Sequence, residues 1–506
     1  MLRLRAGPGG VRVIPVDLFS KLRLATITQK GEAGMPIEIP FIQSCEESPD
    51  PVLVILPSPL ASGEEAELEF AYRGNGVIQD DYEGMHILAP GDWYPVLNAA
   101  RDWAIYDLTY RIPRKRGIVS VGKFVGSSDD GEFKIYHFAT GSPVRGAAFN
   151  YGDFLNIERD DQVSGVRIGV SISRTSPYHL WATSQDDIRR VAWDVLADSI
   201  NTARVGTAYF GPLVQNDIAV SEQPQWGFGQ SWPTLIYIPA IAFVESFLRV
   251  DPWRKEIIPR AFAQQWWGNS IGSATYRDAW LEDGLTEFTV GLVLENALGA
   301  KEFRDYWKRV RKDILDNGEI GPISLGRRLT SQKTPDAYKT IVRYKGAFVV
   351  QMLRNLFRDE RSANPDQRFI GMMKDFATTW AGRNPTTADF RAIVERHAPP
   401  ALAGDMGWFF RQWIEGTAIP EIKAAIRIEE GANGHYLLTG EITQSEVPGD
   451  FRSILPVYLE LEKGRFERSA QVSIIGNSTL IVRQEIPLPK KPLGVIVNPN
   501  HEWLTR

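Results

Sequence analysis

Two neighbouring segments place polar side chains at the spacing of one helical turn. In "DPWRKEIIPRAFAQQWWG", Arg260 and Gln264 are four residues apart, and in the predicted helix Trp280–Leu298 the same spacing separates Asp283 from Glu287. Residues four apart share one face of a helix. Two ligands on one helix and a carboxylate from the next are the arrangement of a helical zinc site, so the chemistry to test here is metal binding.

The residues around these helices resemble a known family. The segments "QWWGN" (Gln265–Asn269) and "WLEDG" (Trp280–Gly284) are similar to the M1 zinc aminopeptidases, whose pattern reads HExxHxWxGN and then W-L-x-E-G. The 19 positions from Gln264 to Asp283 equal the family's spacing between its second His and its Glu ligand. The resemblance implies a gluzincin architecture with its metal site at these residues.

The residue types at the matched positions differ from the family's. Arg260 stands at the first His, Ala261 at the general-base Glu, Gln264 at the second His and Asp283 at the Glu ligand. Arginine stays protonated and does not ligate zinc, glutamine is a poor donor beside imidazole, and alanine cannot take a proton from water. Only Asp283 keeps a ligand atom. The resemblance therefore implies a chain without catalytic zinc, and we predict no metal and no other cofactor.

The histidines favour the same prediction. None of them lies between residues 180 and 396, and no two have the spacing of a helical ligand pair; they are His86, His137, His179, His397, His435 and His501. Because a catalytic zinc site needs three protein ligands and a base, conventional M1 chemistry is not expected.

Two further segments correspond to substrate-handling parts of the family. "FGQSWP" (Phe228–Pro233) matches the amine-binding loop G-x-M-E-N and places Ser231 at its Glu. "RYKG" matches Y-x-K-G and places Arg343 at the transition-state Tyr, with Tyr344 one position later. The resemblance implies that recognition of a free amine is lost, whereas Arg343 can bind an oxyanion or a carboxylate.

The pattern along the chain predicts an α+β multidomain protein. Short strands separated by turn residues fill 1–175, a thermolysin-like, mainly helical domain fills 176–420, and strands at ten-residue spacing predict a C-terminal β-sandwich over 421–506. "FFRQWIEGTAIPEI" and "PLGVIVNPNHEWL" extend the resemblance over nearly the whole chain. The first domain is short for the family, which suggests an N-terminally trimmed or mis-started chain.

Local periodicity supports this division. In "AELEFAY", Leu68, Phe70 and Tyr72 share one face of a strand. Helical periodicity begins at Ile188, Val191, Ala192, Val195 and Leu196. Beyond Trp280–Leu298, further helices are expected over Lys345–Arg358, Arg368–Trp380 and Thr387–Arg396.

Composition bears on partners, disulfides and membrane segments. With 57 basic and 62 acidic residues the net charge is −5, which argues against nucleic acid as a partner. Cys45 is the only cysteine, so no internal disulfide is expected. No signal-peptide pattern and no apolar run long enough for a transmembrane helix occur. Family resemblance suggests an envelope or membrane-associated context, while the sequence leaves compartment and oligomeric state open.

We predict an M1-like pseudopeptidase that binds a peptide or protein partner in the former active-site cleft. The cleft residues expected to contact it are Gly229, Gln230, Ser231, Trp232, Glu287 and Tyr344, and an extended peptide would add to a sheet edge. One alternative is a structural or assembly module of a larger complex. The other is a residual metallopeptidase or hydrolase with an atypical site built on Asp283, Glu287 and Arg343.

Loss of the metal has an electrostatic consequence. If Asp283 is buried and no cation lies beside it, its uncompensated charge would destabilise the fold by several kcal/mol. We therefore expect Arg260, with help from Arg343, to pair with Asp283 and fill the former metal cavity.

Overall fold

The computed structural model describes the chain except residues 8, 32–34, 46–49, 77, 82–83, 88–91, 98–101, 177–178, 180–183, 224–228, 244–250, 318–319, 403, 432–434 and 489. The chain divides into two compact units, each described by itself. Unit 1 comprises Met1–Ala197 and Gln215–Arg254, and unit 2 comprises Asp198–Val214 and Lys255–Arg506.

Unit 1 begins with two antiparallel sheets, of order β1-β7-β3-β4 and β2-β6-β5. Their strands are β1 (Leu2–Arg5), β2 (Val11–Val16), β3 (Leu22–Lys30), β4 (Pro36–Glu38), β5 (Phe41–Ile42), β6 (Val52–Leu60) and β7 (Glu65–Gly74). Leu68 is fully buried in the cluster that both sheets share, and Phe70 and Tyr72 pack against it. The predicted alternation along β7 is confirmed.

Two more antiparallel sheets follow, of order β11-β14-β9-β8 and β10-β13-β12. Their strands are β8 (Ile78–Asp81), β9 (Gly84–Ile87), β10 (Asp107–Pro113), β11 (Gly117–Ser120), β12 (Lys123–Asp130), β13 (Phe133–Ala139) and β14 (Phe149–Gly152). An aromatic cluster that includes Tyr110, Phe138 and Phe149 joins the two sheets.

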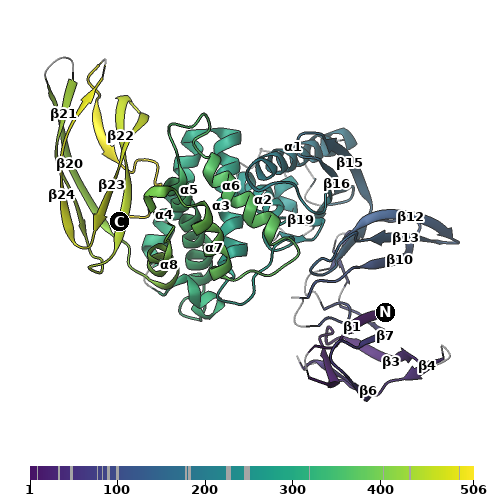
Figure 1. Cartoon of the computed structure of the whole chain (residues 1–506). Helices are drawn as coiled ribbons and strands as arrows, with labels where there is room; N and C mark the ends of the chain where they lie inside the picture. Colours follow the sequence, from purple (N-terminus) through teal and green to yellow (C-terminus); the bar gives the residue numbers. More distant parts are fainter. Residues whose placement is uncertain are drawn as a thin grey trace. The chain divides into compact units, whose positions relative to one another are not determined.

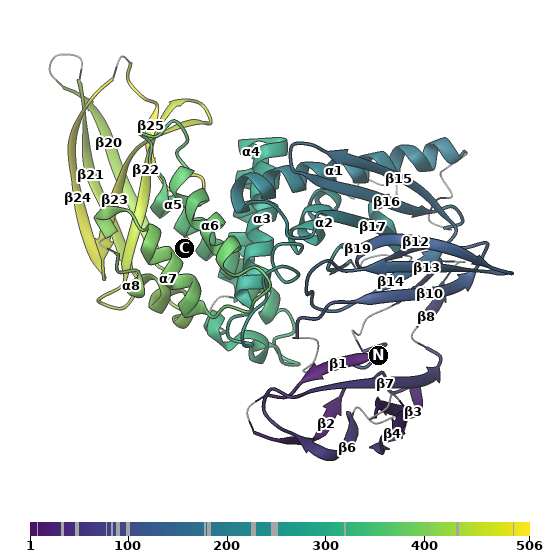
Figure 2. The same ribbon diagram turned by 45° about the vertical axis from the view of Figure 1, so that its right-hand side comes forward.

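A five-stranded mixed sheet of order β15-β16-β17-β19-β18 completes unit 1. Its strands are β15 (Phe154–Asp161), β16 (Val166–Ser173), β17 (Asp217–Gln223), β18 (Gln230–Trp232) and β19 (Leu235–Pro239). Helix α1 spans Gln185–Phe210, and its part in unit 1, which ends at Ala197, runs beside β15 and β16 in both views (Figures 1 and 2). The predicted helical face is confirmed, since Val191, Val195 and Leu196 are buried. In this arrangement β18 forms one edge of the sheet.

The helices of unit 2 form the green and teal body of Figure 1. They are α2 (Asp251–Ala263, from Lys255 onward), α3 (Trp280–Leu298), α4 (Ala300–Asn317), η6 (Ile323–Leu329), the π-helix η7 (Tyr338–Lys345), α5 (Gly346–Phe357), α6 (Gln367–Thr379), α7 (Thr387–His397), α8 (Gly407–Phe410) and η9 (Arg411–Glu415). The helices predicted over Trp280–Leu298, Lys345–Arg358, Arg368–Trp380 and Thr387–Arg396 correspond to α3, α5, α6 and α7, with ends that agree within one residue. Helix α4 was not among them. The helix predicted in "DPWRKEIIPRAFAQQWWG" corresponds to α2, which ends at Ala263, so Gln264 lies beyond it.

Two three-stranded sheets form the C-terminal part, of order β20-β21-β24 and β23-β22-β25. Their strands are β20 (Glu421–Glu430), β21 (His435–Ser445), β22 (Arg452–Glu462), β23 (Arg465–Ile475), β24 (Ser478–Pro487) and β25 (Gly494–Val497). Leu438, Leu459 and Ile486 come from both sheets and share one apolar core, as in a β-sandwich. The pair of sheets is seen in yellow-green in Figure 1.

The predicted fold class is confirmed: the chain is a multidomain α+β protein with an N-terminal β region, a central helical part and a C-terminal β-sandwich. The domain limits at residues 175 and 420 stay predictions. Among the helices that the structure describes, none combines the length and the apolar character that a membrane span requires.

Candidate functional site

Two tryptophans that follow α2 fix the position of its end, and one of them is bonded to α3. The indole Nε1 of Trp267 donates to Thr289 Oγ1 on α3 at 3.1 Å, and that of Trp266 donates to the carbonyl of Gly211 at 3.1 Å. Both rings are buried. Gly268 follows with a φ of 111°, a conformation that favours glycine. The "QWWGN" segment therefore sets the position of α2 relative to α3.

Arg260 on α2 forms a two-point ion pair with Glu287 on α3. Its Nε donates to Glu287 Oε2 at 2.8 Å and its Nη2 donates to Oε1 at 2.9 Å. The Glu287 side chain is 0% exposed and that of Arg260 is 21% exposed. Paired N–H donors on one carboxylate make a strong, geometrically specific contact.

The pair shifts the protonation of both groups. Burial alone would raise the pKa of Glu287, but the charge and hydrogen bonds of Arg260, with the charge of Arg343, lower it to about 2. Burial opposes the charge of Arg260 as well, yet Glu287 raises the pKa of the guanidinium. Both groups are therefore charged at neutral pH, and neither is suited to exchange protons with a substrate.

Three further residues complete this charge cluster. Glu256, one turn before Arg260 on α2, accepts from Arg260 Nη2 at 3.2 Å and from Arg309 of α4. The hydroxyl of Tyr306, also on α4, donates to Glu287 Oε1 at 2.8 Å. Sequence reasoning missed all three. The spacing of four residues between Glu256 and Arg260 was the available signal.

Asp283 has a different partner from the one expected. Its Oδ2 accepts from the hydroxyl of Tyr338 at 2.5 Å, and burial followed by this carboxylate raises the pKa of Tyr338. The predicted pairing of Arg260 with Asp283 is wrong in its partner, because Arg260 binds Glu287. Glu287 is the fully buried carboxylate of the two, so it is the one for which an unpaired charge would be most unfavourable.

Two side chains of the π-helix η7 lie beside two carboxylates of α3. Tyr338 and Arg343 are five residues apart on η7, and they lie near Asp283 and Glu287, which are four apart on α3. Hydrogen bonds from i to i+5 widen a π-turn and bring residues five apart onto one side. Arg343 Nε stands 3.9 Å from Glu287 Oε2, with 29% of its side chain exposed. Arg343 is therefore an accessible cation whose carboxylate is already held by Arg260.

The remaining predicted cleft residues lie in both units. Gly229, Gln230, Ser231 and Trp232 belong to unit 1, where the last three form the edge strand β18. Phe228 falls outside the described residues. Trp232 is buried in an apolar cluster of unit 1.

Glu287 and Tyr344 belong to unit 2, and both are buried. Complete burial of Glu287 is at odds with its predicted contact to a peptide, because an enclosed side chain presents no surface. Its role in the structure is to hold Arg260. That the residues of the two units share a cleft stays a prediction.

Comparison with known proteins bears on this arrangement. Residues 236–413 match the family model "Peptidase family M1 domain". A leucine aminopeptidase 2 of Emericella nidulans is 25% identical over 229 residues, 43% of this chain and 34% of that protein. A leukotriene A-4 hydrolase of Xenopus laevis is 22% identical over 31% of this chain and 26% of that protein. The chain thus matches well under half of the length of these curated relatives.

Solved structures share the fold. An M1 zinc metallopeptidase from Deinococcus radiodurans has a TM-score of 0.61 and 18% identity, and covers 82% of this chain and 89% of its own. A variant of that enzyme bound to a Tyr-Ser-Ala substrate gives 0.62 at the same identity. Residues 236–413 are thus similar to the M1 peptidase domain, and the chain shares the fold of these solved structures.

The side chains at the positions matched to the zinc ligands do not fit a zinc ion. A zinc site needs donor atoms with free electron pairs, whereas a guanidinium has only N–H donors. Arg260 directs those donors at Glu287, and Ala261 has no ionisable group. Within the described part of the chain, no group of three or more His, Cys, Asp or Glu side chains is placed to hold a metal. We therefore derive no metal-dependent step from this site.

Proposed function

We propose that this M1-like protein is a pseudopeptidase that binds a peptide without cleaving it. The observation that carries the proposal is the two-point contact of Arg260 with the fully buried Glu287. It places a permanent cation where the resemblance puts a metal ligand. With Ala261 at the general-base position, no group remains there to activate water.

The charges of the site indicate what such a peptide presents. Among the described side chains of the charge cluster, Arg260, Arg309 and Arg343 face two carboxylates, those of Glu256 and Glu287. The unbalanced cation is Arg343, because Glu287 is already bound at both oxygens. A guanidinium that is partly exposed favours a carboxylate as its partner. The peptide therefore offers a C-terminal carboxylate or an acidic side chain.

The edge strand β18 supplies a second element of the proposal. An extended peptide can add to an open sheet edge through main-chain hydrogen bonds, and β18 pairs only with β19 among the described strands of its sheet. Because β18 and Arg343 belong to different units, a variant at Arg343 tests the carboxylate contact and not the contact with β18.

The first experiment is elemental analysis of purified protein that has not been exposed to a chelator. We expect less than about 0.1 equivalents of zinc or any other transition metal, since structural and catalytic sites retain metal near one equivalent. Near-stoichiometric metal would overturn the pseudopeptidase proposal. Cleavage of reporter peptides by that material would then support the residual hydrolase instead.

Binding is tested with fluorescent peptides whose C-terminus is either free or amidated. We expect the free acid to bind about tenfold more tightly, which corresponds to one charge-assisted contact, and the difference to vanish in Arg343→Gln. Arg277→Gln is the matched control, because Arg277 is an exposed arginine outside the cluster. If no peptide binds at millimolar concentration, peptide recognition is refuted and the assembly role is favoured.

A further inference from the structure

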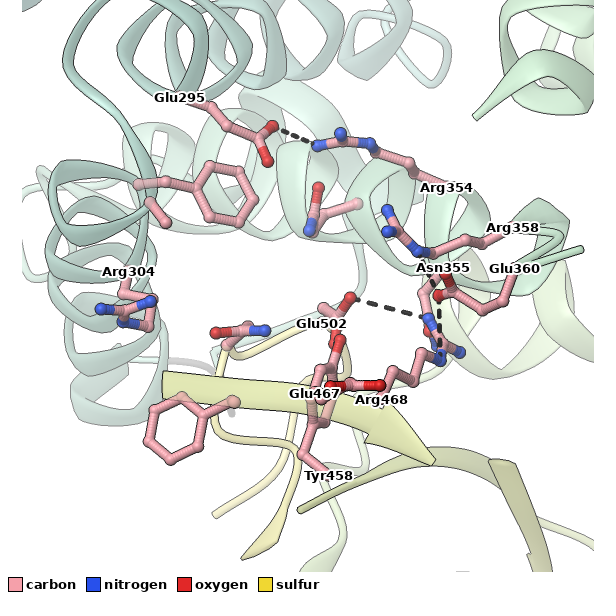
Figure 3. A pocket seen from close by; sticks show the side chains of 15 residues that line it. Glu295, Arg304, Arg354, Asn355, Arg358, Glu360, Tyr458, Glu467, Arg468 and Glu502 are labelled. Carbon is pink, nitrogen blue, oxygen red and sulfur yellow. Dashed lines mark hydrogen bonds and ion pairs between the residues drawn. The ribbon is translucent and has the colours of Figure 1, made fainter. Parts of the chain in front are cut away.

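The arginines of unit 2 differ in whether a carboxylate of the chain compensates their charge. Four arginines and four glutamates line a polar cavity between helices α3, α4 and α5 and strands β22 and β23 (Figure 3). There, Arg468 Nε lies 3.8 Å from Glu360 Oε1 and its Nη1 lies 3.7 Å from Glu502 Oε1. Because such cations already have partners, a surface whose cations lack them is better suited to bind an anionic molecule.

The segment that contains η6 and η7 is strongly basic. From Gly321 to Lys345 it has six basic residues and one acidic residue, Asp336, in a chain whose net charge is −5. Four of the basic side chains are exposed, namely Arg327, Arg328, Lys333 and Lys339. Among the described residues, none of these four forms an ion pair. Together with the partly exposed Arg343, they form what we term the basic surface.

Tyr276, in the loop before α3, positions one part of the basic surface. Gly326 of η6 has a φ of 53°, and a Cβ atom at this residue would overlap the carbonyl oxygen of Tyr276, so the two backbones are in contact. The guanidinium of Arg328 lies 4.4 Å from the centre of the Tyr276 ring, and that of Arg277 lies 5.3 Å from it. A guanidinium held on an aromatic ring has less freedom to lose when it binds an anion.

Arg327 connects this part to the site described above. Burial and the carboxylate of Asp283 raise the pKa of Tyr338, and the charge of Arg327 opposes that rise, so the Arg327 guanidinium lies close to this hydroxyl. Asp283 and Glu287 are four residues apart on α3, which is roughly 6 Å along the helix axis. Since Arg343 lies beside Glu287, Arg327 and Arg343 are separated by about one helical turn.

This spacing suits a peptide better than a nucleic acid. In an extended peptide, alternate side chains are about 6.6–6.8 Å apart, close to the separation of Arg327 from Arg343. Double-stranded DNA carries a negative charge about every 1.7 Å along its axis. The carboxylates of Asp283 and Asp336, which lie among these cations, would repel so dense a polyanion, whereas the separate acidic side chains of a peptide can be placed between them.

We propose that the basic surface binds the acidic C-terminal tail of a peptide or protein. The terminal carboxylate lies at Arg343, and acidic side chains at alternate positions before it lie at Arg327 and Arg328. This inference rests on the proposed function, because it takes Arg343 as the contact of the C-terminus, and it adds which side chains precede that terminus.

Fluorescence anisotropy on the intact protein tests this with a two-by-two set of short labelled peptides. They carry either glutamate or glutamine at alternate positions, and their C-terminus is either free or amidated. Exposed ion pairs are individually weak, but several act together here, so we expect glutamine to lower the affinity by about tenfold at low ionic strength. The difference should shrink as salt is added, because salt screens exposed charges.

Variants of the basic surface locate the contact. The double variant Arg327→Gln, Arg328→Gln should remove most of the preference for glutamate and leave the preference for a free C-terminus unchanged. Lys339→Gln is a second variant at an exposed position, where Nζ lies 5.4 Å from the centre of the Tyr344 ring, and it should reduce the preference for glutamate to a smaller extent. Thermal melting of each variant establishes that it is folded.

The matched control is the double variant Arg361→Gln, Arg368→Gln. It removes the same charge from two exposed arginines outside the basic surface, and it should bind all the peptides as the wild type does. Arg277→Gln, at the border of the surface, should lower the affinity for the glutamate peptides without altering the preference for a free C-terminus.

The outcomes separate this proposal from the proposed function. Equal binding of glutamate and glutamine peptides, no binding of the glutamate peptides at millimolar concentration, or tighter binding of an oligonucleotide or of anionic vesicles would overturn the acidic tail. A folded Arg327→Gln, Arg328→Gln variant with unchanged preference would overturn it as well. If glutamate is preferred but free and amidated C-termini bind equally, the basic surface stands and the carboxylate contact at Arg343 fails.

Discussion

Gly284 of α3 and Gly346 of α5 are in backbone contact. A Cβ atom built on Gly284 would stand 2.9 Å from the carbonyl carbon of Gly346, closer than van der Waals contact allows. These glycines end the segments "WLEDG" and "RYKG". Their contact therefore places Asp283, one residue before Gly284, and Arg343, three residues before Gly346, on adjoining helices.

We expect Gly284→Ala to destabilise the protein by about 1–3 kcal/mol, because the two helix backbones must separate. Gly371→Ala in α6 is the matched control. The nearest atom to its Cβ is 3.9 Å away, so alanine fits there and its helix propensity should stabilise by up to about 1 kcal/mol. Thermal melting of the three proteins decides. A melting temperature of Gly284→Ala at or above that of the wild type would show that the helices part without strain.

The ion pair predicts a non-additive response to substitution. Arg260→Ala leaves Glu287 buried without a cation, and we expect a loss of about 3–5 kcal/mol. The double variant Arg260→Met, Glu287→Leu removes both charges while filling the space, and should recover most of that loss. Urea unfolding measures all three. A double variant no more stable than Arg260→Ala would mean that the pair itself, rather than charge compensation, stabilises this region.

Lowering the pH should weaken the ion pair of Arg260 and Glu287 within a defined pH range. The pKa of Glu287 is lowered from 4.5 to about 2 in the fold, so its ionisation stabilises the native state, by about 3 kcal/mol. That stabilisation is complete above about pH 4.5 and is lost as the pH falls towards 2. By pH 3.5 the stability difference between wild type and Glu287→Gln should therefore shrink by about 1 kcal/mol.

Differential scanning calorimetry at pH 6 and pH 3.5 measures this change. Glu158→Gln, which alters an exposed ion pair with Arg167, serves as the control, and its difference from wild type should stay nearly constant. A constant difference for Glu287→Gln as well would show that Glu287 is not stabilised as an anion.

Metal binding at the matched positions should require several changes together. We expect Arg260→His alone to bind no stoichiometric zinc, because Ala261 and Gln264 still supply no ligand or base. The combination Arg260→His, Ala261→Glu, Gln264→His, Asp283→Glu recreates the family's donor set and should bind about one equivalent. Zinc titration by calorimetry separates the two. If the fourfold variant folds without binding zinc, the matched positions do not form a metal site in this frame.

The parts of the structure that follow a simple period were predictable. The ends of α3 at Trp280 and Leu298 and the inward face of β7 follow from apolar spacing. Helix α4 has the same kind of spacing in Phe303, Tyr306, Val310 and Ile314, yet it was missed, although a helical pattern was visible in the residues.

The pairing within the site was not predictable to the same degree. Spacing shows that Asp283 and Glu287 share a face, but it does not say which of them is enclosed. The choice of Glu287 by Arg260 depends on the packing of α2 and α4 against α3, and on a π-turn in η7 that no local sequence rule indicates. The residue types predicted a cation beside a carboxylate. Only the packing shows that this carboxylate belongs to Glu287 and not to Asp283.

The contact between Arg260 and Glu287 also limits which single substitutions this chain can accept during evolution. Once an arginine on α2 is held by an enclosed glutamate, exchanging either residue alone strands the charge of the other. Exposed positions of the fold can then vary during evolution, whereas a change to a metal ligand at residue 260 passes through less stable intermediates. Residues 260 and 287 should therefore change together or not at all.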